Sequence, residues 1–232
     1  MANPAFVYNP PLSPYLRILY QDDDILVADK PSGLLSVPGK AKEHKDSLIN
    51  RVNSVFPTAT IVHRLDMATS GIIIMALNKH SHRNLSKQFE LRQTKKRYFA
   101  RVYGQVDALK GEIDLPLICD WPNRPKQMVD HERGKRALTH YEVIERKENE
   151  SLVALYPVTG RSHQLRVHML ALNHPILGDR LYAHNDALKM ASRLQLHAES
   201  LCLRHPVTNA WHTFQSSIPF SLYRPPALEP GR

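Results

Sequence analysis

Residues 61–77 read IVHRLDMATSGIIIMAL, and this stretch decides both the fold and the candidate site. Two apolar runs enclose a polar segment that ends at Gly71, a pattern that predicts a strand, a loop and a second, buried strand. The loop carries Asp66 between rigid flanks and away from the sheet, which is the placement that a catalytic carboxylate needs. On these residues alone, Asp66 could instead pair with Arg64 or cap a turn.

Strands are expected on both sides of this segment, because short apolar runs alternate there with turn residues. The predicted strands span residues 16–20, 25–28, 72–77, 97–103, 112–118, 139–144, 152–157, 194–203 and 211–215. The first two form a predicted hairpin with a polar turn. In the fourth, Tyr98, Ala100 and Val102 alternate with Phe99, Arg101 and Tyr103 in strand fashion.

Three helices are predicted between these strands from apolar residues at helical spacing. Their inward residues are Leu48, Val52 and Val55 after an N-cap at Asp46 or Ser47, then Leu85 and Phe89, then Leu165, Met169 and Leu172 after Ser162. Many adjacent strands with few helices predict an α+β fold, in which a mixed, mostly antiparallel central sheet is flanked by helices and loops.

Proline-rich ends frame the chain. Four prolines fall in the first 14 residues and three in the last ten, so irregular extensions are expected at residues 1–15 and 221–232. Between them there is no Gly/Ser linker, low-complexity tract or fixed-period repeat. We therefore expect a single catalytic domain at residues 16–220.

The composition favours an anionic partner. The chain has 232 residues, 42% of them hydrophobic, which is enough for one sizeable core. Lys and Arg number 31 against 22 Asp and Glu, for a formal net charge of +9 and a pI near 9.6. Such a charge favours binding to nucleic acid, although many basic residues do no more than keep a protein surface solvated.

The cysteines, the histidines and the hydropathy of the chain limit which classes of protein remain possible. Cys119 and Cys202 form no CxxC or CxxH pattern, and the 13 histidines form no HExxH, so neither a disulfide framework nor a metal site is predicted. No apolar run approaches the ~20 residues of a membrane span. The first residues also lack the order of a secretory signal. We expect a cytoplasmic protein with reduced thiols and no membrane partner.

Several motifs, taken together, resemble one enzyme family. His63-Arg64-Leu65-Asp66 followed by Thr69-Ser70-Gly71 resembles the signature of the RluA-type pseudouridine synthases. Further segments resemble that family's motifs in the same order: DKPSG at 29–33, KKRY at 95–98, GRSHQLR at 160–166, HPILGD at 174–179 and LHA at 196–198. The resemblance covers about residues 16–220 and implies the pseudouridine synthase fold.

Residues 114–127, DLPLICDWPNRPKQ, resemble the smallest subgroup of this family. That subgroup lacks a separate N-terminal S4-like RNA-binding domain and acts on 23S ribosomal RNA and transfer RNA. The resemblance implies that the partners are stem-loops of these RNAs, the tRNA anticodon stem-loop included, and that loop uridines are isomerised. We expect a monomer.

The chemistry of this reaction needs one carboxylate. Pseudouridine forms when the C1′–N1 bond of uridine breaks and C1′–C5 forms, so nothing is oxidised and no group is imported. No metal and no other cofactor is therefore expected. By resemblance the carboxylate is Asp66, which could attack C1′ or C6, or remove the 2′ proton to give a glycal. The residues leave these three routes open, and the resemblance favours the glycal.

Three further residues are expected around the reacting uridine. Arg161 is predicted to orient Asp66 through a bidentate pair, although its spacing also fits an exposed arginine before a helix. By resemblance, Tyr98 stacks on the uracil with its hydroxyl toward the sugar, and Leu165 packs against the other side of the base. By spacing alone, Tyr98 and Leu165 are equally well explained as core residues.

RNA contacts are expected around the carboxylate, because a stacked uridine must flip out to reach it. Arg64 could stack in place of the flipped base, and His63 could bind a phosphate or a neighbouring base. Residues 83–101 carry seven Lys and Arg against Glu90 alone, which suits phosphate contact or a solvated helix face. The other predicted RNA contacts are Lys95, Lys96, Arg97, Arg166, Trp121 and Arg124.

Two other readings use different chemistry. A non-catalytic RNA-binding or ribosome-assembly protein on the same scaffold would gain nothing from a carboxylate that faces phosphates. A hydrolase that pairs Ser70 or Ser162 with His63 or His163 lacks a nucleophile elbow such as GxSxG.

Overall fold

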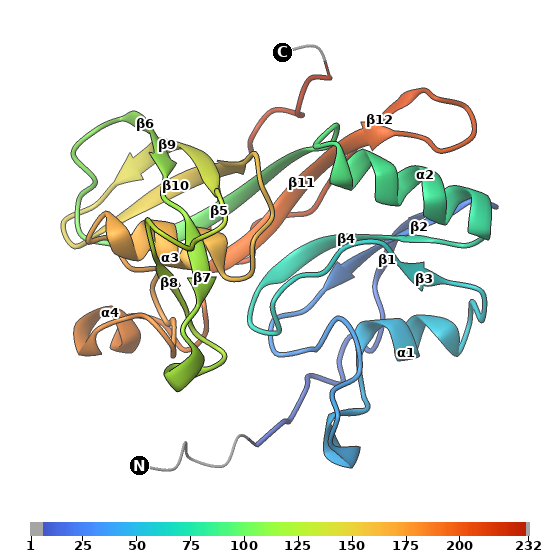
Figure 1. Ribbon diagram of the computed structural model, residues 1–232, viewed down its shortest axis with the longest axis horizontal. Helices are drawn as coiled ribbons and strands as arrows, with labels where there is room; N and C mark the ends of the chain where they lie inside the picture. The colour runs from blue at the N-terminus through green and yellow to red at the C-terminus, as the bar shows by residue number, and fades with distance from the viewer. Residues whose placement is uncertain (1–6, 231–232) are drawn as a thin grey trace.

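A ten-stranded sheet runs through the computed structural model, which describes residues 7–230 (Figure 1). Its main path follows the order β1-β2-β4-β11-β5-β10-β9-β6, with β12 paired to β11 and β3 paired to β4. The strands are Ile18–Gln21 (β1), Ile25–Lys30 (β2), Thr60–Ile61 (β3), Ser70–Ala76 (β4), Lys95–Tyr103 (β5), Lys110–Asp114 (β6), Leu138–Arg146 (β9), Glu150–Pro157 (β10), Leu196–Arg204 (β11) and Trp211–Gln215 (β12). Within this sheet β4 pairs with β11 in parallel, and the other pairings are antiparallel.

Short helices and a small ribbon complete the architecture. The helices are Leu48–Asn53 (α1), Lys79–Glu90 (α2), Gln164–Ala171 (α3) and Asn185–Lys189 (α4), with 3-10 turns at Lys42–His44 (η1) and Trp121–Asn123 (η2). A separate antiparallel ribbon is made of Leu117–Cys119 (β7) and Gln127–Val129 (β8). The predicted α+β fold with a mixed, mostly antiparallel sheet is confirmed. In residues 7–230, no helix is long and apolar enough to cross a membrane.

The helices lie on both faces of the sheet. On β4, Met75 packs in one cluster with Leu48 of α1, and the adjacent Ile74 packs in another cluster with Leu85 of α2. Because successive side chains of a strand point to opposite faces, α1 and α2 cover opposite faces.

The third helix shares a face with α1. Leu196 of β11 packs with Leu165 of α3, whereas Ala198, two residues further along β11, packs with Leu48 of α1. Side chains two residues apart on a strand point to the same face. The two helices therefore stand side by side on one face, over opposite halves of the sheet (Figure 1).

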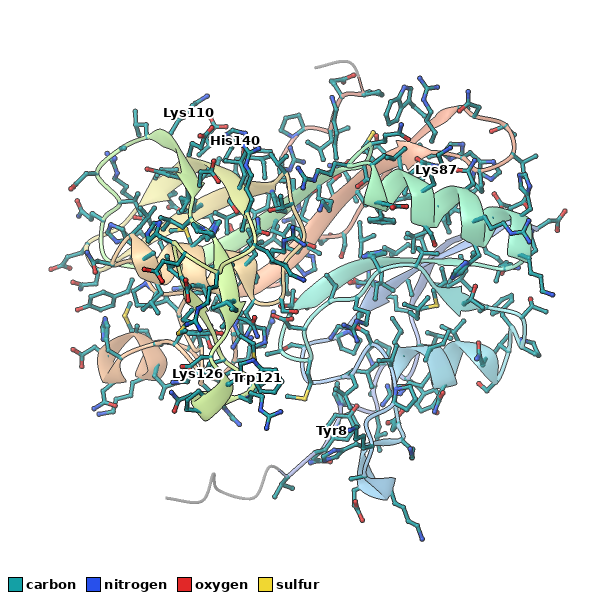
Figure 2. The ribbon with its side chains drawn as sticks, viewed as in Figure 1. Tyr8, Lys87, Lys110, Trp121, Lys126 and His140 are labelled. Carbon is teal, nitrogen blue, oxygen red and sulfur yellow. The ribbon has the colours of Figure 1, made fainter. Side chains whose placement is uncertain are left out.

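The chain ends pack on the body. Ile218, beyond β12, is buried with Phe99 and Leu152 on the face opposite α3. Near the N-terminus, Tyr8 donates its hydroxyl proton to the carbonyl of Asp46 at 2.8 Å, just before α1 (Figure 2). The predicted extensions at 1–15 and 221–232 contain no helix or strand within the described residues, and residues 1–6 and 231–232 lie outside them.

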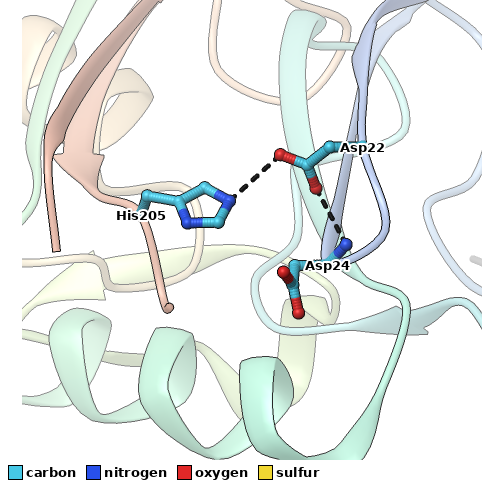
Figure 3. Close-up of side chains that lie close together, drawn as sticks. All are labelled: Asp22, Asp24 and His205. Atoms are coloured by element: carbon cyan, nitrogen blue, oxygen red, sulfur yellow. Dashed lines mark hydrogen bonds and ion pairs between the residues drawn. The ribbon is translucent and has the colours of Figure 1, made fainter. Parts of the chain in front are cut away.

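A hydrogen-bonded clamp joins the β11–β12 loop to the β1–β2 turn (Figure 3). The Nδ1 atom of His205 accepts from the backbone N–H groups of Val207 and Thr208, so its Nε2 carries the proton that is donated to Asp22 at 3.0 Å. The other oxygen of Asp22 accepts the backbone N–H of Asp24 at 2.8 Å. Within the described part of the chain, Asp22, Asp24 and His205 form the single group of side chains close enough to bind a metal ion. The hydrogen bonds to Asp22 explain why these residues lie together.

Most predicted elements are present, and one strand prediction is wrong. Residues 112–118 do not form a single strand, because β6 ends in the main sheet and β7 begins in the ribbon. Pro116 lies between them and has no N–H to donate to a ladder.

Two helix boundaries also differ from the prediction. The third helix begins at Gln164 rather than Ser162, because His163 has a left-handed backbone with φ of 54°. Val55 is 61% exposed rather than inward, because α1 has already ended at Asn53.

Candidate active site

Asp66 lies in the loop between β3 and β4, with its side chain 27% exposed. The backbone N–H of Thr69 donates to the Asp66 carbonyl at 3.1 Å and closes a turn. The strand then starts at Ser70, and Gly71 has φ of 116°. A Cβ at Gly71 would lie 2.2 Å from the carbonyl oxygen of Ala198 on β11, so only glycine lets the loop end this close to the neighbouring strand.

Arg166, rather than Arg161, is the arginine bound to Asp66. Its Nη1 donates to Asp66 Oδ2 at 3.3 Å. Arg161 is exposed and donates its Nε to the carbonyl of Arg136 at 3.1 Å, so the predicted pair between Arg161 and Asp66 is wrong. The cause is local, because the side chain of Gln164 accepts the Arg161 backbone N–H and holds that residue outside the first turn of α3.

A second carboxylate holds Arg166 in place. Asp179 accepts from Nε at 2.8 Å and from Nη2 at 2.7 Å, and both side chains are almost fully buried. Burial opposes the charge of Arg166, but the bonds to Asp179 and the field of Asp66 raise the pKa of the guanidinium. The arginine is thus fixed from one side and presents its remaining Nη1 to Asp66.

His163 approaches the same oxygen of Asp66. Its Nε2 lies 3.9 Å from Asp66 Oδ2, and its Nδ1 lies 2.7 Å from the hydroxyl of Tyr182. Burial lowers the pKa of His163 in spite of the nearby carboxylate, so the ring is neutral near pH 7. The sequence offered a signal for this residue, since it lies inside the GRSHQLR motif.

Tyr98 and Leu165 line the pocket beside Asp66. Tyr98 is half-buried on β5, where it packs against the clusters of both α1 and α3. Burial and then the charge of Asp66 raise the pKa of its phenol, which therefore keeps its proton at neutral pH. Leu165 also belongs to the core around α3, so the pocket and core interpretations hold together for this side chain.

Lys30 binds the backbone of the Asp66 loop, and the sequence analysis gave this lysine no role in the site. Its fully buried ammonium donates to the carbonyls of Pro31, Leu34 and Met67 at 2.9, 2.7 and 3.0 Å. Met67 follows Asp66 directly. Burial lowers the pKa of Lys30 to about 7, against the attraction of Asp66. Lys30 lies in the DKPSG motif, but no sequence pattern predicts that three backbone carbonyls surround its ammonium group.

Basic side chains line the pocket around the carboxylate. The pocket encloses about 500 Å³ including its open mouth, and its lining includes Arg64, Lys96 and Arg161. Arg64 and Arg161 are exposed, whereas burial, followed by the charge of Arg92, lowers the pKa of Lys96 to about 8. A positive field therefore surrounds Asp66.

Five predicted RNA contacts lie outside this pocket, and three of them, Arg97, Lys95 and His63, are engaged with other parts of the fold. Arg97 is buried and paired with Glu199 at 2.8 Å, so an RNA contact through its guanidinium is wrong. Lys95 bonds the carbonyl of Glu229 at 3.3 Å in the C-terminal segment. The Nε2 atom of His63 accepts the backbone N–H of Ile74 at 3.0 Å, which leaves only Nδ1 for another partner. Arg97 and Lys95 alternate with Lys96 and Tyr98, so strand periodicity could have separated them.

The ribbon β7–η2–β8 forms a finger, defined as residues 117–129. Its base packs on α3, where Leu117 contacts Val167. Trp121 is 64% exposed near the tip, with the guanidinium of Arg124 4.5 Å from its ring centroid. Figure 2 labels Trp121 and Lys126 in this part of the finger. Trp121 is therefore available for stacking rather than a core residue.

Comparisons with known proteins agree on one family. Residues 24–171 match the family model described as RNA pseudouridylate synthase. The chain is 58% identical over 214 residues to the Escherichia coli (strain K12) dual-specificity RNA pseudouridine synthase RluA, covering 92% of this chain and 98% of that protein. It is 63% identical over 190 residues to the Yersinia pestis protein of the same name, covering 82% and 92%. The solved structure of human RNA Pseudouridylate Synthase Domain Containing 1 is similar with a TM-score of 0.75 at 29% identity, covering 94% of this chain and 87% of that chain.

Proposed function

Since this chain belongs to the RNA pseudouridylate synthase family and converts uridine to pseudouridine in RNA, we propose that it acts on loop uridines of 23S ribosomal RNA and of the tRNA anticodon stem-loop. The Escherichia coli relative, 98% of which is covered, is named for dual specificity on RNA. Residues 114–127 resemble the subgroup that acts on these two RNAs. The catalytic domain is residues 16–220.

One observation carries the catalytic assignment of Asp66. The carboxylate lies within a basic pocket and is held by Arg166, which is itself buried and fixed by Asp179. A carboxylate there repels phosphate and weakens RNA binding, so it is unexplained in a module that only binds RNA. It is explained if Asp66 acts on the sugar or the base of the flipped uridine.

The pocket walls suggest how the uridine is held. The uracil lies between the ring of Tyr98 and the side chain of Leu165, with C1′ beside Asp66. The C1′–N1 bond breaks, the base turns within this slot, and C1′–C5 forms. The proton on C5 then leaves to solvent, and N1, which no longer carries the sugar, takes up a proton, so the product is an isomer of uridine. Tyr98 keeps its phenolic proton, can donate it to N1 and regains one from solvent.

RNA affinity comes from the rim and the finger. Arg64, exposed beside the carboxylate, fills the place of the flipped base. Lys96, Arg161 and Arg124 contact phosphates, and Trp121 stacks on the loop. These contacts lie near the pocket, so a short stem-loop suffices as substrate. One chain supplies the whole pocket, which supports a monomer. The proposed RNA substrates occur in the cytoplasm, which supports that location for the enzyme.

The test offers two RNAs to the purified protein. A minimal tRNA anticodon stem-loop and a minimal 23S rRNA hairpin carry tritium at C5 of uridine, and tritium release is followed at several salt concentrations. We expect both to be converted, with binding that weakens as salt rises. Asp66→Asn is the control, with binding but no release. Conversion of only one RNA would refute dual specificity, and conversion by Asp66→Asn would refute the catalytic assignment.

A further inference from the structure

We propose that His163 is a positioning residue that directs its Nε2–H at the Asp66 carboxylate, in a tautomer that Tyr182 sets through Nδ1. The inference rests on the proposed function, because it concerns the carboxylate that acts there. It gives a role to two side chains beside the Arg166–Asp179 pair that no step of the reaction has yet used.

The hydroxyl of Tyr182 determines the direction of the hydrogen bonds. The backbone N–H of Gln127, at the start of β8, donates to this oxygen at 2.8 Å. His163 Nδ1 lies 2.7 Å from the same oxygen. A phenol has a single proton to give. With Gln127 already donating to the oxygen, that proton goes to His163 Nδ1, which is the acceptor.

The tautomer of His163 follows from this bond. A neutral imidazole that accepts at Nδ1 carries its proton on Nε2. That nitrogen lies 3.9 Å from Asp66 Oδ2, slightly beyond a direct hydrogen bond, and hydrogen bonds in an active site commonly shorten when the substrate binds. The opposite tautomer would turn a lone pair toward the carboxylate and leave the phenol proton of Tyr182 without an acceptor, and both changes cost free energy.

Burial favours the neutral form of the His163 ring. Burial lowers the pKa of His163, Asp66 raises it, Arg166 lowers it and Asp179 raises it, with a net lowering. The ring therefore offers a single N–H near pH 7.

The backbone supports a functional rather than a merely structural position. His163 has φ of 54°, in the left-handed region that is uncommon for residues other than glycine, although histidine adopts it more often than most, as asparagine and aspartate do. It stands at the N-cap of α3 without a side-chain cap, so its side chain is not used to start the helix. Strain of this kind persists where the surrounding structure needs the side chain elsewhere. Here the side chain is aimed at Asp66.

The arrangement has a consequence for the carboxylate. Arg166 Nη1 and His163 Nε2 both approach Oδ2 of Asp66, at 3.3 and 3.9 Å. Among residues 7–230, no donor reaches the other oxygen, Oδ1. Two donors on one oxygen fix the rotation of the carboxylate and leave Oδ1 free to act on the uridine.

The tautomer can be measured directly, without RNA. Nitrogen-15 spectra of the histidine rings distinguish protonated from unprotonated nitrogens, and the ring signals that disappear in His163→Gln identify His163. We expect an unprotonated Nδ1 and a protonated Nε2 near pH 7, and a mixture of tautomers in Tyr182→Phe. A protonated Nδ1, or an imidazolium, would overturn the proposal and leave the synthase assignment intact.

A pair of substitutions separates positioning from backbone strain. Glutamine places its amide N–H2 near the site of Nε2, whereas asparagine reaches only the site of Nδ1 but tolerates the left-handed backbone better. If His163 acts by donating to Asp66, His163→Gln keeps most of the kcat, and His163→Asn loses roughly tenfold with an unchanged KM, the scale of a hydrogen bond to a charged group. The reverse order would show that only the backbone matters and would overturn the proposal.

Tyr182→Phe and Tyr141→Phe are the matched pair for the hydroxyl. Both remove one tyrosine hydroxyl from a residue that packs near α3, but the hydroxyl of Tyr182 lies 2.7 Å from His163, whereas Tyr141 packs in the core cluster. We expect a lower kcat for Tyr182→Phe and no change for Tyr141→Phe. Equal activity of the two variants would overturn the role of Tyr182.

Discussion

Replacing Asp179 with asparagine should destabilise the fold by about 3 kcal/mol and also slow the isomerisation. Asp179 is 1% exposed. Its Oδ1 accepts from Arg166 at 2.7 Å and from the backbone N–H groups of Leu181 and Tyr182, and its Oδ2 accepts from Arg166 Nε at 2.8 Å. Asparagine keeps one oxygen but turns an N–H2 group toward Nε of Arg166, so that two donors face each other and the negative charge is lost.

The magnitude follows from the burial of this pair. Removing one charge of a buried ion pair costs roughly 3–5 kcal/mol, because the remaining charge stays buried without compensation. We take the lower end, since Arg166 keeps its 3.3 Å contact with Asp66. Without the charge of Asp179, the guanidinium of Arg166 is free to move with Asp66 and no longer holds the carboxylate in one orientation. The kcat should therefore fall at least about tenfold, equivalent to 1.4 kcal/mol.

A matched control separates stability from chemistry. Glu199 is also 1% exposed and pairs with the buried Arg97 at 2.8 Å, but that pair lies away from the pocket. Urea unfolding should show a similar loss of stability for Asp179→Asn and Glu199→Gln. Tritium release, measured where both variants are folded, should fall only for Asp179→Asn. A loss below about 1 kcal/mol for Asp179→Asn, or equally slow turnover in Glu199→Gln, would refute this reasoning.

Three other predictions concern single side chains. Tyr98→Phe keeps the ring that stacks on uracil and loses the phenolic proton, so single-turnover kinetics should show kcat lowered about 100-fold with little change in KM; an unchanged kcat would exclude the hydroxyl from catalysis. Arg124→Ala should weaken RNA binding and reduce the slope of log affinity against log salt by about one, and an unchanged slope would place Arg124 away from phosphate. Burial lowers the pKa of Lys30 to about 7 from 10.5, so between these values the unfolded chain binds more protons than the folded one. Stability should therefore rise with pH across that window, by up to roughly 1.4 kcal/mol per pH unit from this group, and urea unfolding of Lys30→Met should lack that contribution; equal slopes for the two proteins would contradict it.

Local patterns predicted the elements better than they predicted the contacts between them. The buried strand at β4 and the helix capped by Ser47 follow from hydrophobic periodicity and a capping residue within a few positions. The choice between Arg161 and Arg166 depends on a left-handed residue and on Asp179, a buried acid that lies 13 positions further along the chain. No local pattern contains that information.

The candidate site shows the same division. Asp66, Tyr98 and Leu165 were found through motifs, and all three line the pocket. Arg97 was misplaced because its charge was read without the two-residue period of its strand. Lys30 could not have been assigned a role in advance, because its three partners are backbone carbonyls brought together only by the fold.

The position of β11 has a consequence for synthesis of the protein. This strand, residues 196–204, lies between β4 and β5, and those two strands carry the Asp66 loop and Tyr98. A nascent chain that has not yet released β11 from the ribosome has a gap where the sheet should join its two halves. Asp66 and Arg166, 100 residues apart in sequence, then have no common framework. We therefore expect the growing chain to be inactive toward RNA until residues 196–204 have emerged from the ribosome.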